Sequence, residues 1–206
     1  MGIFTWIAIL AELDIPETRL EWTLALLHAA TALRPEEAFG LKWADIDWKK
    51  SQINIRRGWS KGIETAGKNK ISMTQVAMHP TLAEALQQWR RETVYGRDAD
   101  WIFASRRSKG TKPRSAGVAA QDYLRPAAIK AGAIAADYRG RFGWHNLRHS
   151  LATFLADNDV SLSVIQRMLR HAKPTTTAVY THRTNSSQIA AQAKFLEAIK
   201  VTSPPV

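Results

Sequence analysis

The sequence of 206 residues contains no cysteine. Disulfide bonds, thiolate nucleophiles and zinc sites with cysteine ligands are therefore excluded, and the composition fits a reducing cytosol. Long apolar runs are also missing, because no stretch reaches the roughly 18 uncharged apolar residues that a membrane span needs. Residues 1–10 are apolar but lack a basic start, and Glu12 and Asp14 follow, which is not the pattern of a signal peptide. We expect a cytoplasmic protein without a membrane span.

Acidic residues are few compared with basic ones. The chain has 29 Lys and Arg against 18 Asp and Glu, which gives a formal net charge of +11. A surface this basic attracts polyanions, nucleic acid first and an anionic membrane second. Eight tryptophans and a hydrophobic fraction of 45% indicate a packed core rather than disorder, and the length suits one sizeable domain.

The apolar periodicity predicts an α+β domain that is mainly helical, with a small antiparallel sheet inserted between the early helices. Alternating apolar and polar residues predict two strands that form a hairpin, over 52–58 and 70–78. Residues 105–116 contain basic residues and no acid, which predicts a basic loop. Helices are predicted over 17–33, from Pro35, over 81–93, 116–131, 146–157, 161–170 and 186–200, and around Tyr180.

The most informative motif is the stretch His145-Asn146-Leu147-Arg148-His149. His145 and Arg148 are three positions apart, so on a helix they share a face. They lie at the start of the helix predicted over 146–157, where main-chain N–H groups and the helix dipole favour an anion such as phosphate. In isolation the pair could equally be a chance feature of a surface helix.

Two further stretches have ordinary structural interpretations when each is taken alone. Arg34 falls between two predicted helices, where a cation at a helix end is common. His171 and Tyr180 follow the helix predicted over 161–170, and could be a surface histidine and a buried tyrosine.

Taken together and in this order, the motifs resemble those of the tyrosine recombinase (phage integrase) family. Thr31-Ala32-Leu33-Arg34, with the Leu-x-Trp-x-Asp-Ile-Asp pattern of residues 41–47, resembles the first arginine box of that family. Residues 145–149 resemble its His-x-x-Arg-His box, and residues 169–171 its Leu-Gly-His box. Tyr180-Thr181-His182 resembles the nucleophile box, at the usual distance of nine residues from His171. The resemblance covers about residues 5–200 and implies the catalytic-domain fold of the family.

The family also places a lysine in a β-hairpin between its first two boxes. Lys68-Asn69-Lys70-Ile71-Ser72 resembles that segment, and the resemblance implies Lys68 as the catalytic lysine, with Lys70 as the alternative.

Three positions depart from the family pattern. Ala32 and Arg170 stand where the family has glycine, and Thr74 stands where an arginine is common. If the backbone at position 170 needs a positive φ, an arginine there is strained. If the backbone stays helical, Arg170 adds one more phosphate contact.

The resemblance implies a site that cuts and rejoins DNA through a 3′-phosphotyrosyl intermediate on Tyr180. Arg34 and Arg148 would clamp the non-bridging oxygens of the phosphate. His145 or His149 would assist the proton transfer, His171 would hydrogen-bond the phosphate, and Lys68 would protonate the leaving 5′ oxygen. Glu37 is expected to orient the site rather than to bind Mg²⁺. No metal, ATP or other cofactor is expected, because the covalent link conserves the bond energy.

The expected partner is double-stranded DNA, with no membrane involved. A tetramer on paired DNA sites is expected through the helix over 186–200, and a monomer in isolation. Residues 1–206 are expected to form a single catalytic domain without the N-terminal DNA-clamping domain of the family, with 201–206 as a flexible tail. The expected DNA contacts are Arg56, Arg57, Lys61, Lys70, Arg106, Arg107, Lys109, Lys112 and Arg114.

Two other functions fit parts of the pattern. A nicking enzyme of the type IB topoisomerase kind would use the same tyrosine chemistry without exchanging strands. A non-catalytic DNA-binding module would use residues 161–182 as a helix-turn-helix. The protein is expected to be cytoplasmic and encoded by a bacterium or a phage.

Overall fold

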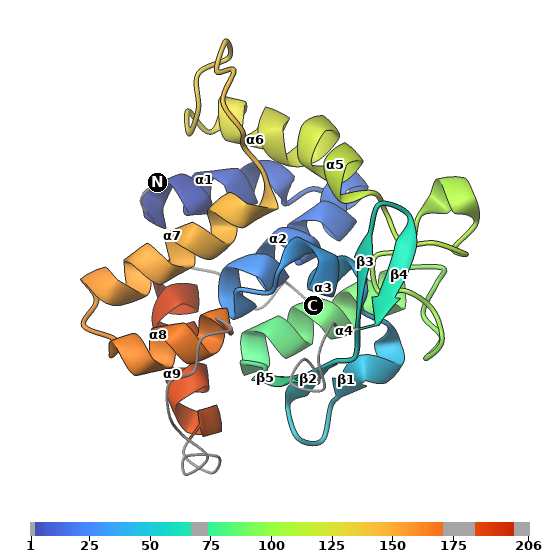
Figure 1. Cartoon of the computed structure of the whole chain (residues 1–206). Helices are drawn as coiled ribbons and strands as arrows, with labels where there is room; N and C mark the ends of the chain where they lie inside the picture. Colours follow the sequence, from blue (N-terminus) through green and yellow to red (C-terminus); the bar gives the residue numbers. More distant parts are fainter. Residues whose placement is uncertain (1–2, 67–73, 171–183, 200–206) are drawn as a thin grey trace.

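The computed structural model describes residues 3–66, 74–170 and 184–199. It is mainly helical with a small antiparallel sheet, which confirms the predicted fold class. The helices, drawn in Figure 1, are α1 (Ile3–Leu13), α2 (Arg19–Thr31), α3 (Pro35–Phe39), α4 (Pro80–Glu92), α5 (Ala116–Ala119), α6 (Arg125–Lys130), α7 (Trp144–Asp157), α8 (Leu162–Leu169) and α9 (Thr184–Ala198). The strands are β1 (Ile46–Asp47), β2 (Gln52–Ile55), β3 (Arg57–Ser60), β4 (Ile63–Ala66) and β5 (Thr74–Ala77).

Helix α2 lies at the centre of the domain, and α1, α3, α4, α7 and α9 pack around it (Figure 1). Every residue from Glu21 to Thr31 is buried, so α2 has no solvent face. The tryptophans contribute to this core as predicted, and the most deeply buried are Trp6 and Trp43. The predicted helix over 17–33 is confirmed as Arg19–Thr31, and the hydroxyl of Thr18, just before it, donates to Leu13 O at 2.7 Å.

The sheet has the strand order β1-β2-β5, and all its pairs are antiparallel. Ile53 pairs with Ile46 on one side and with Val76 on the other, and all three side chains are buried in the core. The strand predicted over 52–58 is interrupted at Arg56. The chain then continues as β3, which pairs with β4 as a separate two-stranded hairpin.

The segment predicted as one helix over 116–131 is continuous but irregular. A π-helical turn over Ala120–Leu124 joins α5 to α6. Helix α4 begins at Pro80, a residue that suits a first helical turn, and it buries Leu82, Ala85, Leu86 and Trp89 on one face. Helix α1 was not predicted, and it packs on α2 and α6.

Candidate active site

Arg34 lies in the short connection between α2 and α3. Helix α2 ends where Ala32 takes a left-handed conformation with φ 53°, and Arg34 then adopts an extended conformation as the N-cap of α3. Glu37, in the first turn of α3, accepts from the main-chain N–H of Arg34 at 2.8 Å and from its Nη1 at 3.0 Å. One carboxylate therefore caps the helix and orients the guanidinium.

Arg148 lies in the second turn of α7. The helix start is fixed by Asn146, whose Oδ1 accepts from the N–H of Gly143 at 2.9 Å. Arg148 is 8% exposed; its Nη1 donates to Ala32 O at 2.5 Å and its Nη2 donates to Leu169 O. Burial lowers the pKa of Arg148 to about 10, with further contributions from the nearby charges of Arg170 and Arg34. The side chain is therefore a fixed cation at neutral pH.

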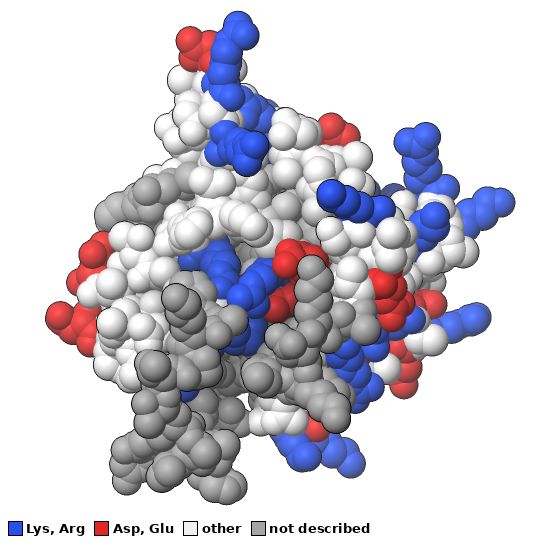
Figure 2. All heavy atoms as spheres, in the orientation of Figure 1, with Lys and Arg blue, Asp and Glu red and all other residues white. Residues whose placement is uncertain are grey.

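The end of α8 brings Arg34 and Arg148 together. Arg34 Nη2 donates to Arg170 O at 3.0 Å, while Arg148 Nη2 donates to the preceding carbonyl, Leu169 O. Two guanidinium groups from opposite halves of the chain thus bind consecutive carbonyls. Figure 2 shows Lys and Arg atoms gathered with acidic atoms in a hollow near the middle of this face.

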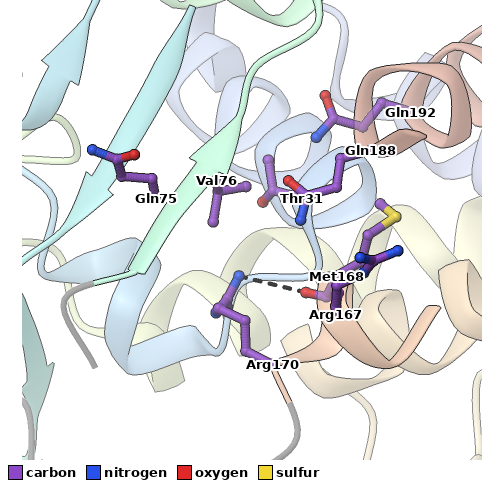
Figure 3. Close-up of a pocket in the computed structure, with 8 residues that line it drawn as sticks. All are labelled: Thr31, Gln75, Val76, Arg167, Met168, Arg170, Gln188 and Gln192. Atoms are coloured by element: carbon purple, nitrogen blue, oxygen red, sulfur yellow. Dashed lines mark hydrogen bonds between the residues drawn. The ribbon is translucent and has the colours of Figure 1, made fainter. Parts of the chain in front are cut away.

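Arg170 resolves the alternative that the sequence left open. Its backbone is left-handed, with φ 48° and ψ 47°, so α8 ends before it. Its side chain is 10% exposed and turns inward, where Nη2 contacts Glu37 Oε2 at 2.5 Å. Figure 3 shows Arg170 beside a cavity of about 190 Å³ that Thr31 and Gln188 also line, with Nη1 at 3.5 Å from Met168 O.

Glu37 carries the negative charge of this cluster. Burial alone would raise the pKa of its carboxyl, but Arg170, the N–H of Arg34 and the guanidinium of Arg34 outweigh burial and hold that pKa below its usual value. Burial likewise lowers the pKa of Arg170, while the ion pair with Glu37 opposes that shift. The cluster therefore combines three guanidinium groups with one shared carboxylate.

The two histidines of the His-x-x-Arg-His motif flank Arg148 in the sequence, but their side chains are more exposed than that of Arg148. His145 and His149 are both exposed on the first turns of α7. His28 of α2 lies against Trp144, the first residue of α7. No sequence motif surrounds His28, so the sequence alone does not single it out. Its ring is fully buried, stacks on Trp144 at 5.0 Å between centroids, and places Nδ1 at 2.9 Å from Leu24 O.

Four of the predicted site residues lie outside the described residues, namely Lys68, Lys70, His171 and Tyr180. The helix expected around Tyr180 and the tail over 201–206 lie outside them too. Their roles remain predictions from the sequence.

The predicted DNA contacts fall into two groups. Side chains exposed to solvent are Arg56, Lys61, Arg106, Arg107, Lys109 and Lys112. In Figure 2 several Lys and Arg side chains project from the side where Figure 1 shows the loop between α4 and α5.

Arg57 and Arg114 instead bind buried carboxylates. Arg57 Nη1 lies 2.5 Å from Asp45 Oδ2, and Asp45 is fully buried. Arg114 Nη2 lies 2.9 Å from Glu21 Oε1, and Glu21 is 2% exposed. A buried carboxylate needs a partner to offset the loss of its hydration. Both arginines therefore have structural roles, and their contacts with DNA phosphates stay predictions from the sequence.

A groove of about 560 Å³ lies between the β3–β4 hairpin and the basic loop. Its lining includes Trp59, Lys61 and Lys112, together with Pro35 and Glu36, which follow Arg34 in the sequence. The groove therefore combines exposed lysines with the first residues of α3.

The described segments contain no group of three or more His, Cys, Asp or Glu side chains that could hold a metal ion. In the same segments, no helix is long and apolar enough to cross a membrane.

Comparison with known proteins identifies relatives of the whole domain. Tyrosine recombinase XerD of Neisseria meningitidis is 29% identical over 175 residues, which cover 84% of this chain and 54% of that protein. Tyrosine recombinase XerA of Pyrococcus furiosus is 30% identical over 174 residues, which cover 82% of this chain and 53% of that protein. The chain thus spans about half the length of these curated relatives.

Solved structures share the fold. The Tn1549 transposon integrase in complex with transposon right end DNA has a TM-score of 0.65 at 16% identity, with 91% of this chain and 57% of that chain covered. The crystal structure of XerA recombinase has a TM-score of 0.63 at 20% identity, with 98% of this chain and 64% of that chain covered. The sequence model that describes the phage integrase family matches residues 8–187 of this chain. The chain therefore belongs to the phage integrase family.

Proposed function

We propose that this chain is the catalytic part of a site-specific DNA recombinase that works through a 3′-phosphotyrosyl intermediate. The observation that carries the proposal is the convergence of Arg34 and Arg148 on consecutive carbonyls at the end of α8. Tyr180 follows that point in the sequence, within the nucleophile motif.

The fixed geometry of the arginines suits phosphoryl transfer. Attack on a DNA phosphodiester places negative charge on two non-bridging oxygens, and guanidinium forks bind such oxygens in a planar arrangement. Arg148 is held by Ala32 O and Leu169 O, and Arg34 by Glu37 and Arg170 O. Donors that are already held in place need little reorganisation when charge develops, which is the condition for electrostatic catalysis.

The proposed reaction transfers a phosphoryl group from the DNA to Tyr180, and then from Tyr180 to a 5′ hydroxyl of DNA. The Tyr180 oxygen forms a bond to phosphorus and loses its proton to His145 or His149. The bond from phosphorus to the 5′ oxygen breaks, and Lys68 protonates that oxygen. His171 hydrogen-bonds the phosphate. A 5′ hydroxyl from the same or a partner duplex then attacks the phosphotyrosine and releases Tyr180.

DNA is the proposed partner, in the cytoplasm of a bacterium. We place its backbone along the groove that Lys61 and Lys112 line, with Arg106, Arg107 and Lys109 on the neighbouring loop. The names of several structural relatives, such as the Tn1549 transposon integrase with right end DNA, support a DNA partner.

The proposed assembly is a monomer in isolation and a tetramer on paired DNA sites. In the single chain α9 packs on its own domain. Gln192 bonds Ala77 O at 2.7 Å and the N–H of His79 at 2.8 Å, and Phe195 is buried. Tetramer formation would then require α9, or the segment before it, to contact a neighbouring subunit.

The decisive test is to trap the covalent intermediate. The protein is incubated with a library of nicked duplexes, in which a short fragment is lost after cleavage, and adducts that survive denaturing electrophoresis are collected. We expect an adduct whose peptide carries a 3′-linked nucleotide on Tyr180 in a mass spectrum. The same adducts reveal the target sequence.

The Tyr180→Phe variant should lose the adduct and retain DNA binding. Tyr138→Phe is the matched control, because Tyr138 is an exposed tyrosine in the loop before α7, and it should form the adduct normally. An adduct that persists in Tyr180→Phe, or that carries a 5′-linked nucleotide, would overturn the proposed function.

A further inference from the structure

Arg170 occupies a position that disfavours its own residue type. Its φ of 48° lies in the left-handed region, where the Cβ of an L-residue is crowded and glycine is preferred. The chain nevertheless has an arginine at the C-terminus of α8, next to the segment that contains His171. A strained backbone at a candidate site suggests that the side chain has a purpose there.

The side chain of Arg170 also lies close to charges of its own sign. It is 10% exposed, its Nε has no hydrogen-bond partner within the described part of the chain, and its charge acts unfavourably on Arg148. Within the described residues, Glu37 is the negative charge that offsets burial and repulsion, through the contact of its Oε2 with Nη2 at 2.5 Å, while Nη1 lies 3.5 Å from the uncharged Met168 O. The energetic case for an arginine at this position therefore depends on Glu37.

Glu37 is in turn shared between two arginines. Its Oε1 accepts from Arg34 Nη1, and its Oε2 accepts from both the N–H of Arg34 and Arg170 Nη2. Without Arg170, the full charge of this carboxylate would act on Arg34 and reduce the attraction of Arg34 for an anion. With Arg170 present, the carboxylate is shared, so more of the positive charge of Arg34 remains available to a phosphate.

We propose that Arg170 is a positioning residue that acts through Glu37: it binds the carboxylate so that Glu37 orients Arg34 without cancelling its charge. This inference rests on the proposed function, since the anion is the phosphate that Arg34 and Arg148 bind. It distinguishes this chain from a protein with glycine at the same position, in which Glu37 would pair with Arg34 alone.

A double-mutant cycle between Arg170 and Glu37 tests the inference. The variants are Arg170→Gly, Glu37→Gln and the double variant, with Arg170→Lys as the conservative change. Ser51→Gly is the matched control for glycine at a left-handed position, because Ser51 has φ 50°. Two quantities are measured, namely the single-turnover rate of adduct formation at saturating DNA and the affinity for inorganic sulfate by thermal shift.

We expect Arg170→Gly to slow adduct formation by about tenfold or more at saturating DNA, because an electrostatic stabiliser of the transition state is weakened. Arg170→Lys should recover part of that loss. The effect of Glu37→Gln on the rate of adduct formation should reverse its sign between the two backgrounds. In the parent protein, Glu37→Gln should slow adduct formation. In Arg170→Gly it should speed adduct formation by about threefold or more, because the uncompensated carboxylate has been removed. Sulfate affinity should follow the same order, and Ser51→Gly should match the parent.

A structural role alone gives a different result, in which Glu37→Gln lowers the rate and the sulfate affinity equally in both backgrounds. That result, or an Arg170→Gly variant with unchanged rate and sulfate affinity, overturns the inference while an adduct in the parent protein leaves the proposed function intact. If neither the parent protein nor any variant forms an adduct but sulfate affinity shows the sign reversal, the proposed function fails and the role of Arg170 stands. If Arg170→Gly does not fold, Arg170→Asn, which is uncharged and tolerates a left-handed conformation, supplies the same cycle with and without Glu37→Gln.

Discussion

At the scale of single residues, the guanidinium groups of the candidate site are held mainly by main-chain carbonyls and by one carboxylate. Arg148 binds two carbonyls, Arg34 binds Glu37 and one carbonyl, and neither has a carboxylate to itself. A full ion pair would neutralise a guanidinium, whereas a carbonyl orients it and leaves its charge. This arrangement suits groups that must attract an anion.

His28 gives the first prediction at this scale. Burial lowers the pKa of His28 to about 4 in the folded protein, against 6.5 as the ordinary value. Between these two pH values the unfolded chain takes up a proton at His28 that the folded protein does not. The free energy of unfolding should therefore fall as the pH drops from 6.5 toward 4, by about 3 kcal/mol from this residue.

His28→Asn removes the titration and retains an N–H group that can reach Leu24 O. We expect the difference in the free energy of unfolding between pH 7 and pH 4.5, measured with urea, to be smaller in the variant than in the parent. Equal differences in both proteins would show that His28 does not have the low pKa that its burial implies.

At the scale of elements, Asp45 links the turn after α3 to the β3–β4 hairpin. Its carboxylate accepts from the N–H of Lys42 at 2.8 Å and from Arg57 Nη1 at 2.5 Å, and lies 3.6 Å from Arg56 Nε. This binding turns Arg57 inward, and the chain changes from β2 to β3 at that point. One buried carboxylate therefore binds the chain at the point where the hairpin leaves the sheet.

Asp45→Asn should destabilise the fold by about 3 kcal/mol, because it removes the buried charge that Arg57 Nη1 and Nη2 bind. Arg57 then keeps only the more exposed carboxylate of Glu64, 3.5 Å from its Nε. Asp47→Asn is the control, since Asp47 is 32% exposed and its lysine partner, Lys50, is 4.0 Å away. Its effect should stay below about 1 kcal/mol. Urea unfolding measures both, and similar losses in the two variants would contradict the role given to Asp45.

At the scale of the whole molecule, the net charge is +11, and the basic side chains fall into two groups, those that pair with buried acids and those that are exposed to solvent. Arg57 and Arg114 neutralise buried acids, whereas Lys61 and Lys112 line the groove between the β3–β4 hairpin and the basic loop. The second group should account for the dependence of DNA binding on salt, because cations that contact phosphates release counterions.

Lys112→Ala should weaken DNA binding and lower the slope of log K against log salt by about 1. Lys194→Ala is the control, because Lys194 is exposed on α9 and bonds Asn158 O at 3.1 Å. Fluorescence anisotropy at several salt concentrations measures both slopes. An unchanged slope in Lys112→Ala would show that Lys112 does not contact DNA phosphates and that the groove is not part of the DNA-binding surface.

The sequence by itself determined most helices and the family. Half-buried helices such as α4 repeat apolar residues at helical spacing, and this repeat can be read without a structure. Helix α1 was missed because apolar residues fill all but two of its positions from Ile3 to Leu13, so no polar face marks the period. The strand predicted over 52–58 was too long, because β2 ends at Ile55. The break at Arg56 lies beside the contact between Asp45 and Arg57, which local sequence does not reveal.

The motifs that resemble the family predicted Arg34, Arg148 and Glu37, which the structure brings together. Only the tertiary structure decided the conformation of Arg170, the sharing of Glu37 and the position of His28 beneath Trp144. Periodicity and motifs record which residue types recur along the chain. A positive φ, an ion pair between Glu37 and Arg170 or the burial of a histidine depends on which distant segments meet, and that information is absent from local sequence.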